Sequence, residues 1–316
     1  MPNHNLFIMS VLASLLGAYP AQAQPAQPPA STTFQKELTA DALQFQARVD
    51  QAAHALENDP QLKNLTHEQR KNLVEFAAGN MLFAFTHELG HALVSEMGLP
   101  VLGKEEDAVD AFAVLSMLAI GDTVSDRVLN ETATGWFMDA KRNIAEGTKV
   151  PFYDVHSIDK VRADDIVCLM VGSDRARFAA AATKAGLPPD RQASCFYDHD
   201  NAQWSWTTTL RAHLRPASHP APKFAVTYGS GQGQYDALAK AFQNIGILEL
   251  VSGLAADRYI WRRPISFEMK TCGVINAHWD PVHQVITLCY ELGQDFADLY
   301  RGYGLTPPPV ATAKTK

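Results

Sequence analysis

Apolar residues recur at helical spacing through most of residues 34–214, and this pattern predicts a series of helices. The clearest helix begins after Thr66, which has Gln69 three positions later and so can form a capping box. It continues without a proline to Gly98, a residue suited to the left-handed conformation that ends many helices. The helices expected in this half of the chain span residues 34–58, 66–97, 104–120, 123–146, 159–171, 174–185 and 189–214.

The pattern changes after residues 215–223, whose sequence RPASHPAPK contains three prolines and is typical of a linker. Beyond it, alternation of apolar and polar side chains and a run of β-forming types predict strands, with NAHWDP as a turn between the last two. We therefore expect an antiparallel hairpin over residues 264–290. The predicted fold class is α+β and mainly helical, with a small antiparallel sheet. The expected strands are 224–228, 265–269 and 285–289, the turn is 276–281, and the helices are 234–252 and 291–303.

The two ends of the chain predict segments outside the folded domain. Residues 6–19 form an apolar stretch followed by Ala21-Gln22-Ala23, the small-x-small pattern at which signal peptides are cleaved. We expect a signal peptide over residues 1–23, which directs a periplasmic or secreted protein. The expected organisation of the rest is a flexible mature N-terminus at 24–35, one domain at 36–303 and a disordered tail at 304–316.

Composition narrows the class of protein. Of the 316 residues, 47% are hydrophobic and 19% are charged, which is ordinary for a globular protein. The formal net charge is −7 and there is no basic block, whereas a nucleic-acid binder would show a stripe of Lys and Arg. No run of about 18 apolar residues follows the N-terminal stretch, so no membrane-spanning helix is expected. The oligomeric state stays open.

The four cysteines of an exported protein favour two disulfide bonds. Of the possible pairings we expect that of nearest neighbours, Cys168–Cys195 and Cys272–Cys289, with buried free thiols as the alternative. No C-x-x-C motif is present, which argues against a zinc site built from thiolates.

The pentapeptide His87-Glu88-Leu89-Gly90-His91 has the form H-E-x-x-H on a predicted helix. Residues four apart lie one turn apart on the same face, so both imidazoles can bind one Zn²⁺ ion, while Gly90 allows another element to pack closely. Glu88 lies about 100° further around the helix, where it can act as general base on a zinc-bound water. The flanking residues are apolar, and a buried His-Glu-His cluster without a metal is costly to desolvate. The alternative is a solvated face of His and Glu.

A catalytic zinc site also needs a third protein ligand. The next predicted helix begins with several acids, and Glu106 and Asp110 are four apart on one face of it. We expect Glu106 to be the third ligand of one zinc ion per chain, and Asp110 to accept a hydrogen bond from a ligand imidazole. Glu105 is the rival ligand. The plain alternative for the acids of the first turn is their favourable interaction with the helix dipole.

The segment HELGHALVSEMGLPVLGKEEDAVDAFA resembles the signature of a bacterial metallopeptidase family that is catalogued as a domain of unknown function. The blocks FYDVHSID, IVCLMVGSD, CGVINAHWDP and ITLCYEL are similar to later blocks of that family, in the same order. The resemblance covers residues 70–303 and implies a zincin-like fold and a peptidase activity. The E-x-x-x-D spacing also resembles the gluzincin clan, whose third ligand is a glutamate followed four residues later by an aspartate.

Four further residues are candidates for contacts with the substrate or the transition state. Asn276-Ala277, followed by an aromatic residue and a proline, resembles the edge-strand motif with which neprilysin-like gluzincins hold the substrate backbone. Peptide recognition by strand addition would suit this segment, and a hairpin turn is the alternative. His156 and Tyr290 could polarise the scissile carbonyl or steady the oxyanion, with a structural role as the alternative for each.

The function predicted from these features is that of a secreted or periplasmic zinc metalloendopeptidase, whose substrate is a peptide or protein. Glu88 would activate the zinc-bound water for attack on the peptide bond. Two alternatives stay open. One is a non-catalytic, zincin-like binding or scaffold protein with a structural zinc, although such a site has no need of Glu88. The other is a zinc hydrolase that acts on something other than a peptide.

Overall fold

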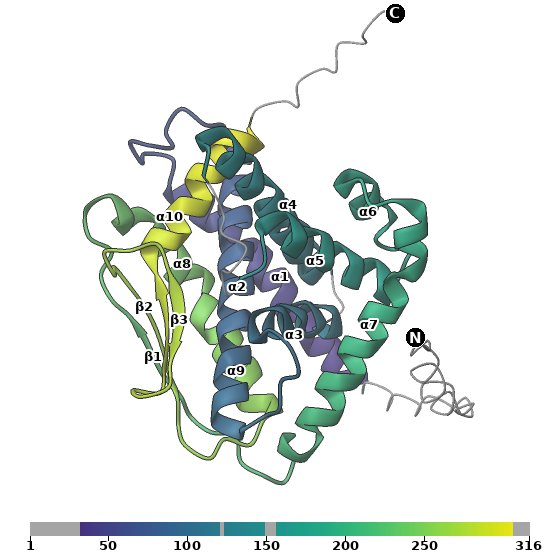
Figure 1. The fold of residues 1–316 in the computed structure, drawn as a ribbon. Helices are drawn as coiled ribbons and strands as arrows, with labels where there is room; N and C mark the ends of the chain where they lie inside the picture. The colour runs from purple at the N-terminus through teal and green to yellow at the C-terminus, as the bar shows by residue number, and fades with distance from the viewer. Residues whose placement is uncertain (1–31, 121–122, 149–155, 306–316) are drawn as a thin grey trace, which may run out of the picture. The chain divides into compact units, whose positions relative to one another are not determined.

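One long helix, α2 (His67–Met97), lies at the centre of the computed structural model, which describes residues 32–120, 123–148 and 156–305 (Figure 1). The helix begins as its sequence predicts, because the side chains of Thr66 and Gln69 each accept a hydrogen bond from the backbone N–H of the other. It ends at Gly98, which has a φ of 63°. Twenty-one of its 31 residues are buried, so other elements cover it on nearly every side.

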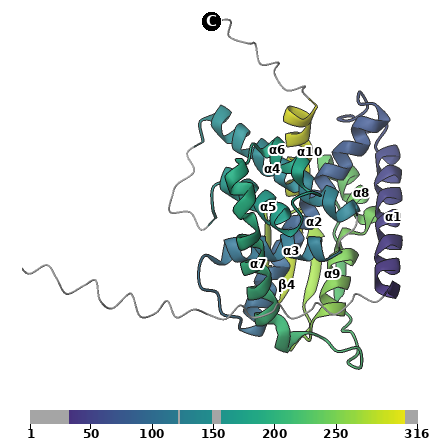
Figure 2. The ribbon, with the colours of Figure 1, turned by 90° about the vertical axis from the view of Figure 1, so that its right-hand side faces the viewer.

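The other helices pack around α2 (Figures 1 and 2). Those in contact with it include α3 (Glu105–Ile120), α4 (Thr123–Glu146), α9 (Ile247–Arg258) and α10 (Tyr290–Leu299). A further layer is formed by α5 (Asp159–Ser173), which packs on α3 and α4, and by α7 (Pro189–Leu210), which packs on α5. The remaining helices are α1 (Thr32–Ala55), α6 (Ala179–Ala185), α8 (Asp236–Ile245) and short turns at Arg211–His213, Gly233–Tyr235 and Tyr300–Gly304.

A small mixed sheet lies against the side of α2 that is away from α5 (Figure 1). Its strands have the order β1-β2-β4-β3. The pairs β1–β2 and β2–β4 are parallel, and β3 pairs antiparallel with β4 at the edge of the sheet. The strands are β1 (Ala225–Tyr228), β2 (Ser266–Lys270), β3 (Ala277–Asp280) and β4 (Val285–Cys289).

The expected antiparallel hairpin over residues 264–290 is therefore wrong. Its two outer segments, β2 and β4, are parallel, because the segment expected as a turn at 276–281 forms the additional strand β3. The reversal lies just after β3, where Asp280 Oδ1 accepts hydrogen bonds from the backbone N–H groups of Val282 and His283. Asp280 and Pro281 thus do take part in a turn, but this turn comes after β3 and does not take its place.

Several helix boundaries also differ from the prediction. The helix expected at 234–252 is two helices, α8 and α9, which are separated at Gly246 with a φ of 79°. The helix expected at 189–214 ends at Leu210, and that expected at 174–185 begins at Ala179. Residues 215–223 contain no helix or strand, and the described residues from Leu38 onward form one compact unit. The predicted signal peptide at 1–23 lies outside the described residues.

The four cysteines form two disulfide bonds in the pairing expected from the sequence. Cys168–Cys195 joins α5 to α7, and Cys272–Cys289 joins the segment before β3 to the end of β4. Disulfide bonds are typical of proteins in oxidising compartments. Among the described helices, none is both long and apolar enough to cross a membrane.

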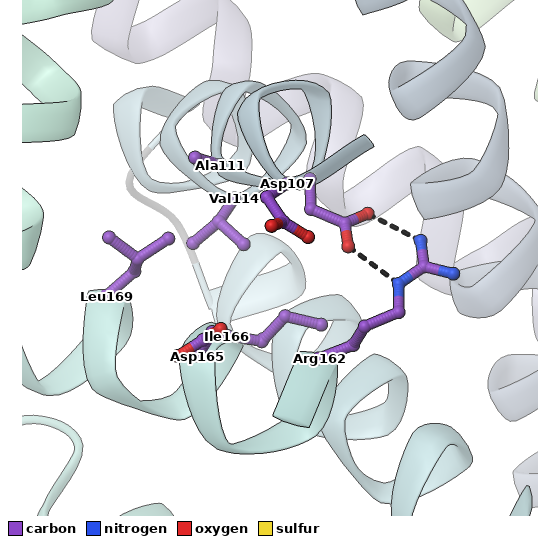
Figure 3. A pocket seen from close by; sticks show the side chains of 8 residues that line it. Asp107, Ala111, Val114, Arg162, Asp165, Ile166 and Leu169 are labelled. Atoms are coloured by element: carbon purple, nitrogen blue, oxygen red, sulfur yellow. Dashed lines mark hydrogen bonds and ion pairs between the residues drawn. The ribbon is translucent and has the colours of Figure 1, made fainter. Parts of the chain in front are cut away.

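The packing of α3 against α5 leaves a small cavity between them, with a volume of about 30 Å³ (Figure 3). Its polar lining comes from Asp107 and Asp110 of α3 and from Arg162 and Asp165 of α5. A cavity of this size and polarity has room for a water molecule.

Gly90 sets how closely α3 approaches α2. A Cβ atom built on Gly90 would lie 2.8 Å from Val109 Cβ and 3.2 Å from a ring carbon of Phe112, both on α3. Real Cβ atoms do not come so close, so only glycine permits this approach. The approach brings the first turns of α3 against the turn of α2 that carries His87 and His91.

We predict that Gly90→Ala lowers the free energy of unfolding by about 1–3 kcal/mol, because the added methyl group forces α3 away from α2. Alanine favours a helix more than glycine does, by about 1 kcal/mol, so the steric cost of the methyl group must exceed this gain in helix propensity. Gly253→Ala is the matched control, since Gly253 lies within α9 and a Cβ there meets nothing within 4 Å. It should stabilise the protein. Urea denaturation of both variants measures the difference, and a stabilised Gly90→Ala would contradict the packing argument.

Candidate metal centre

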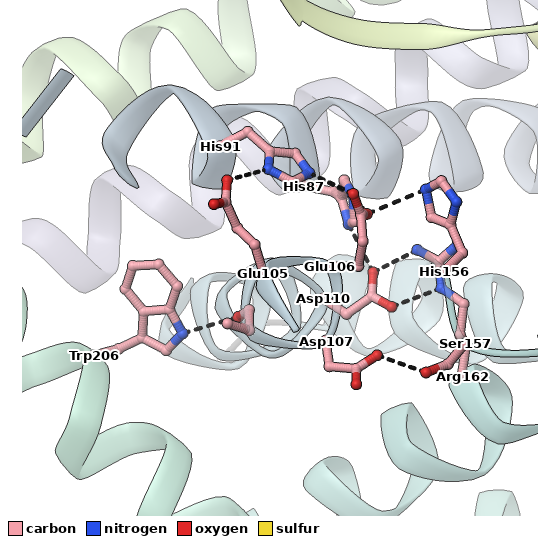
Figure 4. Close-up of polar contacts among 11 residues, drawn as sticks. His87, His91, Glu105, Glu106, Asp107, Asp110, His156, Ser157, Arg162 and Trp206 are labelled. Atoms are coloured by element: carbon pink, nitrogen blue, oxygen red, sulfur yellow. Dashed lines mark hydrogen bonds and ion pairs between the residues drawn. The ribbon is translucent and has the colours of Figure 1, made fainter. Parts of the chain in front are cut away.

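Three side chains bring ligand atoms together where α2 meets α3 (Figure 4). His87 Nε2 lies 3.2 Å from His91 Nε2 and 3.1 Å from Glu106 Oε2. His91 Nε2 lies 3.5 Å from Glu106 Oε1. Ligand atoms bound tetrahedrally to zinc at about 2.0–2.1 Å are about 3.3 Å from one another. The separation of the two imidazole nitrogens is close to this value, and each of them has one carboxylate oxygen of Glu106 at a similar distance.

The kind of ligand also fits zinc. Two imidazoles and one carboxylate form a donor set found in catalytic zinc sites, and three protein ligands leave a fourth position for water or substrate. The sequence places the imidazoles on one face of α2 because they are four residues apart. Glu106 comes from the first turn of α3, which the close approach at Gly90 brings within reach.

Each imidazole has a carboxylate partner at its other ring nitrogen. His87 Nδ1 lies 2.7 Å from Asp110 Oδ1, and His91 Nδ1 lies 2.7 Å from Glu105 Oε1. Such partners fix the tautomer and orientation of a metal-binding imidazole. Glu105, the rival for third ligand, thus lies on the side of the His91 ring away from the converging atoms. Asp110 has the position relative to His87 that the sequence analysis expected of it.

The carboxylates strongly affect the protonation of the cluster. Burial would lower the pKa of His87, but its hydrogen bonds with Asp110 and Glu106 raise it to about 9. The pKa of Glu106 is held well below its ordinary value by hydrogen bonds from His156, His87 and His91. At neutral pH the metal-free cluster therefore holds an imidazolium, and a metal ion would take the place of its proton.

Glu88 stands apart from the three ligand side chains. Burial raises its pKa, and the charges of His87 and His91 together with a hydrogen bond from the backbone N–H of Trp279 counteract the rise only in part. A raised pKa brings a carboxylate closer to the range in which it can accept and later release a proton at neutral pH. Glu88 thus lies between His87 and His91 in the sequence of α2, while its carboxylate faces strand β3.

The cluster lies at the wall of an open cleft with a volume of about 450 Å³. One wall of the cleft comes from α2 and the start of α3, and the opposite wall comes from β3 and its flanking residues. The lining residues from the first wall are His87, Glu88, His91, Ser95, Glu105 and Glu106, and those from the opposite wall are Asn276, Ala277, His278, Trp279 and Pro281. His156, which precedes α5, also lines the cleft.

Along this cleft, strand β3 presents backbone groups that do not pair with β4. The backbone N–H of Cys289 donates to the carbonyl of Asn276, so these two residues form a hydrogen-bonded pair. Such pairs alternate with non-hydrogen-bonded ones in an antiparallel ladder, and Ala277–Leu288 and Trp279–Ile286 are of the second kind. The N–H and C=O groups of Ala277 and Trp279 therefore point away from β4, as the hydrogen bond from Trp279 to Glu88 requires.

The structure brings three of the four further candidates to the cleft. Asn276 and Ala277 line it, and His156 Nε2 lies 3.1 Å from Glu106 Oε2. The hydroxyl of the neighbouring Ser157 donates to Asp107 Oδ1 over 2.7 Å, which ties this segment to α3. Tyr290 does not line the cleft, since its side chain is buried and its hydroxyl donates to the carbonyl of Gly229. Its expected contact with a transition state is not supported by this position.

Two contributors to the site were not predicted from the sequence. The backbone of Trp279 was hidden in a segment interpreted as a turn, and only the strand pairing shows that it faces Glu88. Arg162, which forms two hydrogen bonds with Asp110, lies 52 residues further along the chain and belongs to no local motif. The only sequence feature that could have drawn attention to Arg162 is its positive charge near the start of a helix, where the helix dipole disfavours a cation.

Comparison with known protein families gives one result. The model of the DUF4344 family, whose description is "Putative metallopeptidase", matches residues 47–210 and 229–314. The matched residues include the converging side chains of α2 and α3 and the strand β3. No curated protein and no solved structure matches the chain.

We predict that Glu106→Ala lowers the affinity for zinc by about 100-fold or more, because one of three ligand side chains is lost. Glu105→Ala should lower it by only about 10-fold, because that change frees the orientation of His91 but leaves the ligands in place. Competition with a chromophoric chelator measures both affinities. A larger loss for Glu105→Ala than for Glu106→Ala would show that the third ligand has been misassigned.

Proposed function

The chain belongs to the DUF4344 metallopeptidase family, and on this premise we propose that it is a zinc-dependent endopeptidase with a zincin-like active site. His87, His91 and Glu106 would hold one Zn²⁺ ion per chain. Zinc bound there supplies a Lewis acid that polarises a carbonyl and lowers the pKa of water. The observation that carries the proposal is the convergence of ligand atoms from three side chains, within 4.8 Å of one another, on the wall of an open cleft.

Glu88 is the general base of the proposed reaction. It is next to both ligand imidazoles and lines the cleft, so its carboxylate can accept a proton from the water that attacks the peptide carbonyl. It then passes this proton to the amine of the leaving peptide. The buried position of Glu88 supports this role, because the raised pKa makes the carboxylate a better proton acceptor.

The substrate lies along β3 as an additional strand. The outward N–H and C=O groups of Ala277 and the outward C=O group of Trp279 offer backbone hydrogen bonds to an extended peptide, and the Asn276 side chain adds a polar group at the start of the strand. His156, on the same cleft, donates a hydrogen bond to the oxyanion that forms on the scissile carbonyl.

Export of the protein is part of this proposal. The apolar N-terminal segment followed by Ala21-Gln22-Ala23 supports a cleaved signal peptide over residues 1–23. The two disulfide bonds support the same location, because they persist in the periplasm or outside the cell and are rare in the cytosol.

The proposal is tested by Glu88→Gln, which keeps the size and polarity of the side chain but cannot accept a proton. Peptide hydrolysis should fall by about 10²–10⁴-fold, while zinc content and melting temperature stay close to those of the wild type. Glu75→Gln is the control, since Glu75 is another mostly buried glutamate of α2, paired with Arg127 away from the cleft. It should leave hydrolysis intact. A broad peptide library is the assay, and equal rates for Glu88→Gln and wild type would refute the mechanism.

We further predict that cleavage depends on backbone hydrogen bonds with β3. In a series of cleaved peptides with one N-methylated amide each, methylation at the position facing β3 should lower kcat/KM by about 10-fold, which corresponds to one hydrogen bond. Methylation at the neighbouring amide, which points away from the strand, is the matched control. Equal effects at all positions would show that the substrate is not held as an added strand.

A further inference from the structure

We propose that Arg162 of α5 is a positioning residue of the metal centre, which fixes Asp110 so that His87 presents its Nε2 lone pair to the metal. The inference rests on the proposed zinc site. Arg162 does not contact the donor atoms of the proposed ligands, and it does not line the cleft. The inference is carried by a continuous set of contacts from α4 through α5 and α3 to α2.

The first contact is a two-pronged ion pair with Asp110 (Figures 3 and 4). Arg162 Nε donates to Asp110 Oδ2 over 2.7 Å, and Arg162 Nη2 donates to Asp110 Oδ1 over 2.6 Å. The guanidinium and the carboxylate are both buried, with 9% and 8% of each residue exposed. A planar fork of this kind fixes the rotation of the carboxylate, which a single hydrogen bond does not.

The second contact holds the guanidinium itself. Arg162 Cζ lies 3.8 Å from the ring centroid of Trp136 on α4, so the planar cation stacks on the indole. Arg162 is also close to the N-terminal end of α5, where the helix dipole disfavours a cation. Its position there is explained by the acidic partner on α3 and the aromatic partner on α4, and not by the helix that carries it.

One carboxylate oxygen of Asp110 contacts both Arg162 and His87, and this shared atom connects Arg162 to the metal centre. Asp110 Oδ1 accepts from Arg162 Nη2 and also lies 2.7 Å from His87 Nδ1. With the carboxylate fixed and ionised, Nδ1 carries a hydrogen, so the proton that a metal ion would displace is the one on Nε2, which faces Glu106 and His91. By contrast, the Glu105 side chain that partners His91 is 44% exposed.

The test replaces the fork with a point charge. Arg162→Lys keeps the positive charge, and the adjoining cavity of about 30 Å³ has room for a water molecule that can solvate the ammonium group. We expect the affinity of the full-length protein for zinc to fall by about 10–100-fold, measured by chelator competition. The visible absorption of the Co²⁺-substituted protein should also change, because the direction of one imidazole changes.

Arg177→Lys is the matched control. Arg177 forms the same fork with Asp126, at 2.7 and 2.5 Å, and lies over the ring of Phe178, but none of these residues lines the cleft. The melting temperature of this variant should fall less, because its ion pair is more exposed than that of Arg162, and its zinc affinity and Co²⁺ spectrum should stay unchanged. Loss of zinc affinity in both variants would show a general effect of stability and would overturn the inference.

A double-mutant cycle tests whether Arg162 acts through Asp110. If it does, Arg162→Lys should have little further effect on zinc affinity once Asp110→Asn is present, and additive losses would overturn the inference. If Arg162→Lys does not fold, Trp136→Leu takes its place in the cycle, because it removes the stacking but keeps the ion pair. Wild-type protein that binds no zinc would refute the proposed function, whereas zinc binding by wild type and Arg162→Lys with equal affinity would refute only the role of Arg162.

Discussion

The contact between one turn of α2 and the first two turns of α3 is the constraint on which the rest of the site depends. It places two imidazoles and several carboxylates together in a largely buried position, where charged groups are stable only when they are paired. The contact exists because Gly90 lacks a side chain, so that Val109 can lie directly on the helix backbone. A fold that held the two helices further apart by one methyl group would contain the same residues without the cluster.

Sequence patterns that act locally predicted the corresponding parts of the structure well. The capping box at Thr66, the glycine at the end of α2 and the spacing of His87 and His91 concern neighbours within a few residues, and each determines local geometry directly. The sheet was predicted poorly because strand direction is decided by pairing between distant segments. Nothing in residues 264–290 taken alone shows that β4 lies beside β2 in the parallel sense.

The same distinction applies within the site. The choice of Glu106 over Glu105 rested on its spacing from Asp110 alone, because both glutamates occupy the first turn of α3 and either could reach a ligand imidazole. The structure separates them by the ring nitrogen that each one faces. Tyr290 was a candidate for polarising the scissile carbonyl or steadying the oxyanion. Its hydroxyl instead donates to the carbonyl of Gly229, which directly follows β1.

The two halves of the metal centre are built differently, and the difference follows from burial. His87 borders the cleft but is buried, as is Asp110, so the orientations of both are determined by folding before any ligand binds. His91 and Glu105 lie at the cleft, where water can reach them and side chains can rearrange at low cost. A peptidase needs both properties at one metal. Fixed ligands keep the electrostatics of the site constant through the reaction, and an open side admits a substrate that must lie within reach of Glu88.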